Sequence, residues 1–166
     1  TAADTDAILA LNQESVAVLS PLSRERLAQL QGEAAIQRVI EDHGAVVAFL
    51  LAFREGAAYD SQNYRWFAER YERFLYVDRV VVASAARGRG AGALLYRDVF
   101  EFAATHSIEL VTCEYDVEPP NPASERFHAR FGFSEVGRQR LDDGKRVSLQ
   151  VAQVTGRASA RRHPRR

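Results

Sequence analysis

The spacing of apolar residues changes along the chain, and each change marks a predicted element. Apolar side chains recur at helical spacing in residues 6–13 and again in residues 23–31, where Ser23 is a suitable N-cap. Two runs at 35–41 and 45–54 follow, and the short turn between them predicts an antiparallel pair of strands. Because the second run is almost continuously apolar, we expect it to be a central strand that is covered on both faces.

The second half of the chain alternates between strand and helix patterns. Residues 74–82 predict a strand, 90–106 an amphipathic helix, and 108–115 a strand parallel to the first, because a helix connects the two. The other predicted elements are a helix within 63–72, a short helix at 121–132, and a hairpin formed by 134–141 and 146–154. This order predicts an α/β (α+β) fold with a mixed sheet flanked by helices.

Composition narrows the class of protein. The 166 residues are 46% hydrophobic and 27% charged, and no apolar run approaches the roughly 18 residues of a membrane span. No signal-peptide pattern is present, the single cysteine (Cys113) cannot form an internal disulfide, and no Cys/His cluster has metal-site spacing. We therefore expect one cytoplasmic domain over residues 1–155, without a metal and without membrane contact.

Charge is distributed unevenly, although the formal net charge is zero. Residues 157–166 contain five arginines and no acidic residue, so the part before them carries 17 basic and 22 acidic side chains. We expect residues 156–166 to form a flexible basic tail, since nothing aromatic or periodic accompanies the arginines. No specific recognition of nucleic acid is expected, and the acidic body favours a cationic ligand.

A glycine-rich turn joins the 74–82 strand to the long helix. Gly88, Gly90 and Gly92 leave backbone N–H groups unshielded, and the next helix directs the positive end of its dipole to the same place. The turn is therefore predicted to bind phosphate, and Arg87 and Arg89 add positive charge around it.

Two other phosphate-binding motifs fit this turn less well. A Walker A loop needs Lys and then Ser or Thr after its last glycine, but Ala93 follows Gly92, and Lys145 is the only lysine. A Rossmann fingerprint needs G-x-G-x-x-G after the first strand of repeated βαβ units, whereas the spacing here is G-x-G-x-G in mid-chain. A turn that binds nothing is the remaining alternative, at the conformational cost of three glycines.

The same segment resembles a known family signature. Val80-x-Val82 followed by Arg87-x-x-Gly90-x-Gly92 is similar to the acetyl-coenzyme A motif of the GNAT N-acetyltransferases. A second block resembles another part of that family's pattern and consists of Asn121-Pro122-Ala123-Ser124, Phe127-His128 and Gly132-Phe133. The resemblance extends over about residues 34–154.

The resemblance implies a GNAT-type, strongly twisted sheet of about six to seven strands, with a V-shaped opening between the fourth and fifth. In the family a short first strand precedes the first helix, but this sequence leaves almost no room for it. Either that strand is very short or the sequence is an incomplete copy. Acetyl-CoA would bind as co-substrate through Val80, Val81, Val82, Arg87, Gly88, Arg89, Gly90, Ala91, Gly92 and Asn121.

The implied activity is transfer of an acetyl group to an amine acceptor by direct attack in a ternary complex. The resemblance does not choose between a small molecule, a peptide terminus and a protein lysine as acceptor, and homodimers are common in the family. A catalytically silent coenzyme A-binding or regulatory module, or a partner subunit of a larger complex, is the alternative.

Two carboxyl groups are candidates for the general base. Glu114, at the end of the 108–115 strand, has the place of the base in the ribosomal-protein N-terminal acetyltransferases that this segment resembles, although residues 117–120 add two residues to the following loop. Asp78 is the reserve base and a candidate acceptor contact, because strand alternation predicts that it lies on the same side as Val80 and Val82.

The other candidates concern the leaving thiolate and the acceptor. His128 replaces a family tyrosine that protonates the thiolate, with Tyr115 or solvent as alternative donors. Cys113, a lone strand cysteine, is expected to be inert. In the family, the region before the signature strand helps to enclose the acceptor, so we expect Tyr64 and Trp66 to line the acceptor pocket.

Overall fold

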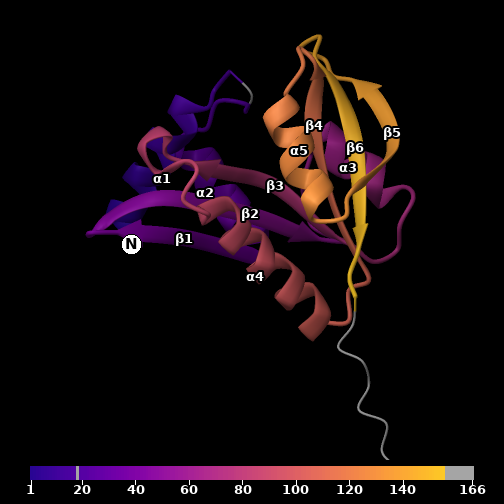
Figure 1. The fold of residues 1–166 in the computed structure, drawn as a ribbon, viewed down its shortest axis with the longest axis horizontal. Coiled ribbons are helices and arrows are strands. Elements are labelled where there is room, and N and C mark those ends of the chain that lie inside the picture. Colours follow the sequence, from indigo (N-terminus) through magenta and orange to yellow (C-terminus); the bar gives the residue numbers. More distant parts are fainter. Residues whose placement is uncertain (18, 156–166) are drawn as a thin grey trace, which may run out of the picture.

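A single six-stranded sheet organises the chain (Figure 1). The computed structural model describes residues 1–17 and 19–155, so the tail predicted for 156–166 lies outside the described residues. The strands lie in the order β1-β2-β3-β4-β6-β5, and all neighbours are antiparallel except β3 and β4. Their bounds are β1 Ile36–Asp42, β2 Ala45–Arg54, β3 Leu75–Val82, β4 Leu110–Glu118, β5 Ser134–Arg140 and β6 Arg146–Gln153.

Helices cover both faces of the sheet, each over its own apolar core (Figure 1). The buried apolar residues of α1 (Ala2–Glu14), α2 (Arg24–Glu33) and α3 (Gln62–Ala68) belong to one core. Those of α4 (Ala91–Thr105), together with apolar residues of α5 (Pro122–Arg130), belong to the other. Within the described residues, none of these helices is long and apolar enough to cross a membrane.

The predicted elements are present, with differences at their ends. The first helix begins at Ala2 instead of residue 6, because Thr1 and Asp4 form a reciprocal capping box that apolar spacing does not reveal. The helix expected within 63–72 already ends at Ala68, where the N–H groups of Arg70 and Tyr71 both bond to the Phe67 carbonyl. β2 lies between β1 and β3, and its middle is buried on both faces as predicted.

The sheet opens between its two parallel strands. β3 and β4 pair at only two positions, Leu75 with Val111 and Tyr76 with Thr112, after which the strands diverge. The described residues contain no strand before α1, so the strands that part are the third and fourth of this chain and not the fourth and fifth. A short 3-10 turn, Ser84–Ala86, then leads from β3 toward α4.

A bulge in β3 changes which way one candidate residue faces. β2 pairs with Val77 and with Arg79 but has no partner for Asp78 between them. Asp78 bonds to Tyr59, which packs on the core beneath α1–α3, whereas Val80 packs on the core beneath α4 and α5. The prediction that Asp78 lies on the same side as Val80 is therefore wrong, because simple alternation does not continue through a bulge.

Candidate active site

A cavity of about 1130 Å³ lies at the β3–β4 opening. Val77 and Tyr96 line it from the core beneath α4 and α5, and Leu141 and Val147 line it from the core beneath α1–α3. The cavity therefore runs from one face of the sheet to the other. Its volume slightly exceeds that of typical small-molecule pockets, which are about 300–1,000 Å³.

The glycine-rich turn lies at the α4 end of this cavity. Gly90 is the N-cap of α4 with φ +86°, and no side chain caps the helix. Gly88, with φ +75°, also needs the left-handed conformation that glycine adopts freely. The first N–H groups of a 15-residue helix therefore remain available at the cavity, together with the positive end of its dipole.

Most of the residues predicted to bind the cofactor line this one cavity. They are Val80, Val81, Val82, Arg87, Gly88, Gly90, Ala91, Gly92 and Asn121. Arg89 is not among them, because its guanidinium turns to Asp42, 3.3 Å away. An uncapped helix start beside a β3 edge that β4 leaves free fits a ligand with a diphosphate and an amide-bearing arm, as coenzyme A has.

Glu114 lies in the same cavity with one oxygen free. Its Oε1 accepts a hydrogen bond from the Tyr76 hydroxyl at 2.9 Å, while Oε2 is buried and has no hydrogen-bond partner among the described residues. Burial and the negative charge of Asp78 raise the pKa of the Glu114 carboxyl from 4.5 to about 8, although the Tyr76 bond acts in the opposite direction. A carboxyl group that exchanges its proton near neutral pH therefore faces the cavity.

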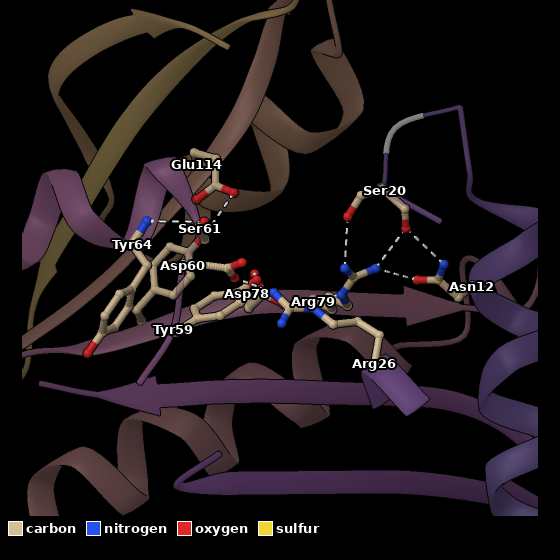
Figure 2. Close-up of polar contacts among 11 residues, drawn as sticks. Asn12, Ser20, Arg26, Tyr59, Asp60, Ser61, Tyr64, Asp78, Arg79 and Glu114 are labelled. Carbon is tan, nitrogen blue, oxygen red and sulfur yellow. Dashed lines mark hydrogen bonds and ion pairs between the residues drawn. The ribbon is translucent and has the colours of Figure 1, made fainter. Parts of the chain in front are cut away.

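The Asp78 carboxylate has a partner for each of its oxygens, whereas Glu114 has a partner for only one. Its Oδ1 accepts from the Tyr59 hydroxyl at 2.5 Å and its Oδ2 lies 3.2 Å from Arg79 Nε (Figure 2). Burial raises the pKa of Asp78, and the Arg79 charge and the Tyr59 bond lower it in part. Because both oxygens have partners, Asp78 is a poorer proton acceptor than Glu114.

Arg79 connects this carboxylate to the segment between α1 and α2. Its Nη1 donates to Asn12 Oδ1 at 2.8 Å and to the Ser20 carbonyl at 2.9 Å, and its Nη2 donates to Ser20 Oγ at 2.8 Å (Figure 2). The Asn12 amide donates to the same carbonyl at 3.1 Å. Arg79 is 5% exposed, so these bonds satisfy a charge that is almost entirely buried.

His128 also lines the cavity, but its two nitrogens are engaged elsewhere. Nδ1 lies 2.7 Å from the Ser124 carbonyl, which can only accept, so Nδ1 carries the proton. Nε2 then accepts from the Tyr96 hydroxyl at 2.7 Å. Burial lowers the pKa of His128, which keeps the ring neutral at pH 7. As bonded here, His128 directs no N–H into the cavity.

Tyr115 offers a hydroxyl in the same region. Its ring stacks on His128 with centroids 5.6 Å apart, and its oxygen accepts from Gln150 Nε2 at 3.2 Å. Tyr115 also lines the cavity. Burial raises the pKa of the neighbouring Cys113 thiol well above its usual value. Cys113 is therefore an unreactive buried thiol, as expected of a lone strand cysteine.

The two aromatic residues predicted to enclose the acceptor do not line the cavity. Tyr64 is 3% exposed, and its hydroxyl donates to the Arg54 carbonyl at 2.7 Å within the core. Trp66 packs against Gly137 of β5, where an added Cβ would come within 2.6 Å of the indole. Tyr59, five residues before Tyr64, lines the cavity instead.

Several lining residues were not predicted from the sequence, among them Tyr59, Arg79 and Tyr96. One signal was available: Asp78-Arg79 is a charged pair inside an otherwise apolar strand, and buried charges are rare without partners or function. The tyrosines gave no such signal, because aromatic residues in these elements fit the core equally well. Within residues 1–17 and 19–155, no group of three His, Cys, Asp or Glu side chains is arranged to hold a metal ion.

Comparisons with known proteins agree with this geometry. A family model described as "Acetyltransferase (GNAT) family" matches residues 7–133. A phosphinothricin N-acetyltransferase from Streptomyces coelicolor is 44% identical over 61 residues, which are 37% of this chain and 34% of that protein. This chain therefore matches about a third of that relative's length.

Solved structures share the fold at low sequence identity. The ribosomal-protein-alanine N-acetyltransferase from Brucella melitensis has a TM-score of 0.65 and 21% identity, over 92% of this chain and 96% of that one. The NatC complex bound to Gag peptide and CoA gives a TM-score of 0.67 and 13% identity, over 91% of each chain. Since the family model covers more than half of the sequence and the fold agrees, the chain belongs to the GNAT acetyltransferase family.

Proposed function

We propose that this chain transfers the acetyl group of acetyl-CoA to a primary amine by direct attack, with Glu114 as the general base. The observation that supports the proposal is the single cavity that joins the uncapped start of α4 to the free Oε2 of Glu114. Phosphate-binding groups and a proton acceptor thus face one continuous space on the two sides of the sheet.

The donor side is assigned to backbone groups. The N–H groups of residues 88–92 hold the diphosphate, with charge from Arg87, which also lines the cavity. The free edge of β3 at residues 80–82 pairs with the amides of the pantetheine arm, and the Val81 or Val82 N–H stabilises the carbonyl oxyanion. When bound, acetyl-CoA supplies an acetyl group that its thioester already activates.

Glu114 accepts the proton of the attacking amine. An α-amine has a pKa of about 8, and the Glu114 carboxyl has a pKa of about 8, so proton transfer between them is close to balanced. Asp78 orients the acceptor side through Tyr59 and Arg79 and is not required to take the proton.

Tyr115 is the better donor for the leaving thiolate. Its hydroxyl accepts a hydrogen bond and keeps its own proton available, whereas the only N–H of a neutral His128 bonds to the Ser124 carbonyl. His128 acts instead through packing, because it fixes the Tyr96 hydroxyl and the Tyr115 ring beside the cavity.

The test is an amine panel read by release of free coenzyme A thiol, after calorimetry with acetyl-CoA. The panel includes phosphinothricin and an alanine-terminated peptide, which the names of the relatives suggest. We expect binding of acetyl-CoA and amine-dependent thiol release that Glu114→Gln lowers. Binding without transfer to any amine would support the silent module instead, and absence of binding would refute the donor site.

A further inference from the structure

Two distant parts of the chain meet over the acceptor side of the cavity. Lys145, in the turn between β5 and β6, donates from Nζ to the Ala17 carbonyl at 2.9 Å, across 128 positions of sequence. Ala17 lies between α1 and α2. Residues on each side of this contact line the cavity, among them Ser15, Leu19, Leu141 and Asp143. We name the Lys145–Ala17 contact the acceptor bridge.

A buried carboxylate holds Lys145 in this position. Lys145 Nζ lies 3.6 Å from Asp116 Oδ2, whose side chain is 9% exposed. That oxygen has no hydrogen-bond partner among the described residues, so its attraction to Lys145 is electrostatic. The acceptor bridge therefore includes one charge-assisted hydrogen bond and one partly buried ion pair.

A second anchor holds the same segment three residues further on. Arg79 donates to both the carbonyl and the hydroxyl of Ser20. Lifting the segment would leave the buried Arg79 guanidinium without these two acceptors, and an uncompensated buried charge is costly. The segment is thus fixed to β3 at Ser20 and to the β5–β6 turn at Ala17.

We propose that the acceptor is a small amine enclosed beneath the acceptor bridge, and not the end of a polypeptide. A peptide advances about 3.3 Å per residue and needs an open path beyond its terminal amine, which the bridge crosses. The space below contains the carboxyl groups of Glu114, Asp78 and Asp116, which suit a compact polar amine. This inference rests on the proposed acetyl transfer.

The experiment compares kcat/KM for small primary amines with kcat/KM for short peptides that carry a free α-amine or a lysine. Wild-type protein should favour the best small amine by roughly 100-fold, because a peptide has to break contacts at two anchors, each worth about tenfold or more. In Lys145→Met the ratio of peptide to small-amine kcat/KM should rise about tenfold, while Lys145→Arg, which retains charge and donors, should stay near wild type.

Each outcome is decisive. Wild-type protein that acetylates a peptide as well as the best small amine overturns the inference, and so does an unchanged ratio in a folded Lys145→Met. If Lys145→Met does not fold, the comparison of small amines with peptides in wild-type protein decides alone. If acetyl-CoA binds but no amine in the panel causes thiol release, the proposed function itself is overturned. Thiol release with peptides alone would overturn only the small-acceptor inference.

Discussion

Replacing Glu114 with glutamine should make the protein more stable at alkaline pH while it removes most of its activity. Glutamine keeps the shape of the side chain and still accepts from the Tyr76 hydroxyl, but it never ionises. The pKa of Glu114 is raised in the folded protein from 4.5 to about 8, so ionisation opposes folding. The stability that this group contributes is fully present below pH 4.5 and is lost as pH rises through about 8.

The raised pKa gives the magnitude of this effect. One pKa unit is worth about 1.4 kcal/mol, so the full loss is about 5 kcal/mol, and solvent near this partly buried side chain reduces it to about 2–5 kcal/mol. Urea unfolding of wild type and Glu114→Gln at pH 5, 7 and 9 measures this pH-dependent loss of stability. The variant should gain about 2–5 kcal/mol over wild type between pH 5 and 9.

Activity should change in the opposite sense. Wild-type kcat/KM should rise about tenfold per pH unit until it levels off near pH 8, and Glu114→Gln should lack this limb. An acceptor whose amine pKa lies below the assayed pH range is the control, because the amine then stays neutral and only the enzyme titrates. A stability difference that does not vary with pH, or full activity of the variant at pH 7, would contradict the reasoning.

Three further predictions follow from the contacts around the cavity. Gly90→Ala should weaken acetyl-CoA binding about tenfold in calorimetry, because alanine relaxes away from φ +86° and regaining it on binding costs about 1–2 kcal/mol. Arg89→Ala should stay within about twofold, since that side chain pairs with Asp42. Tyr76→Phe removes the hydrogen bond that favours the ionised base, so the midpoint of the kcat/KM profile should move above pH 8. Tyr115→Phe should lower kcat by about 100-fold at pH 7, and an unchanged kcat would return the donor role to solvent or His128.

Local signals were enough to predict the strand, the glycine-rich turn and the helix at one end of the cavity. The β-branched run of β3, the glycines after it and the apolar stripe of α4 each lie within a few positions, and Gly88 and Gly90 have the left-handed conformation that only glycine adopts freely. The first block of the family resemblance lies in this strand and turn, and the second lies in residues 121–133. The parallel orientation of β3 and β4 followed from one crossover helix, whereas the opening between them was implied by the family resemblance.

The acceptor side could not be predicted, because it is assembled from distant segments. Arg79 and Ser20 are 59 positions apart, and Lys145 and Ala17 are 128 apart. Which of Tyr59 and Tyr64 lines the cavity depends on where α3 begins. Because Ser61 caps the helix, Tyr64 lies within α3 and is buried in the core, whereas Tyr59 precedes the helix. Periodicity does not reveal such boundaries to within two residues.

The two-residue contact between β3 and β4 has a mechanical consequence. The sheet is in effect two three-stranded halves joined by a narrow seam, with α4 as the covalent link between them. A molecule inserted along the seam and bonded to both halves would restrain their relative motion throughout. Binding of such a molecule should therefore slow amide hydrogen exchange in strands that the molecule does not contact, including β2 and β6. Without it, the two halves should move relative to each other about Leu75 and Tyr76.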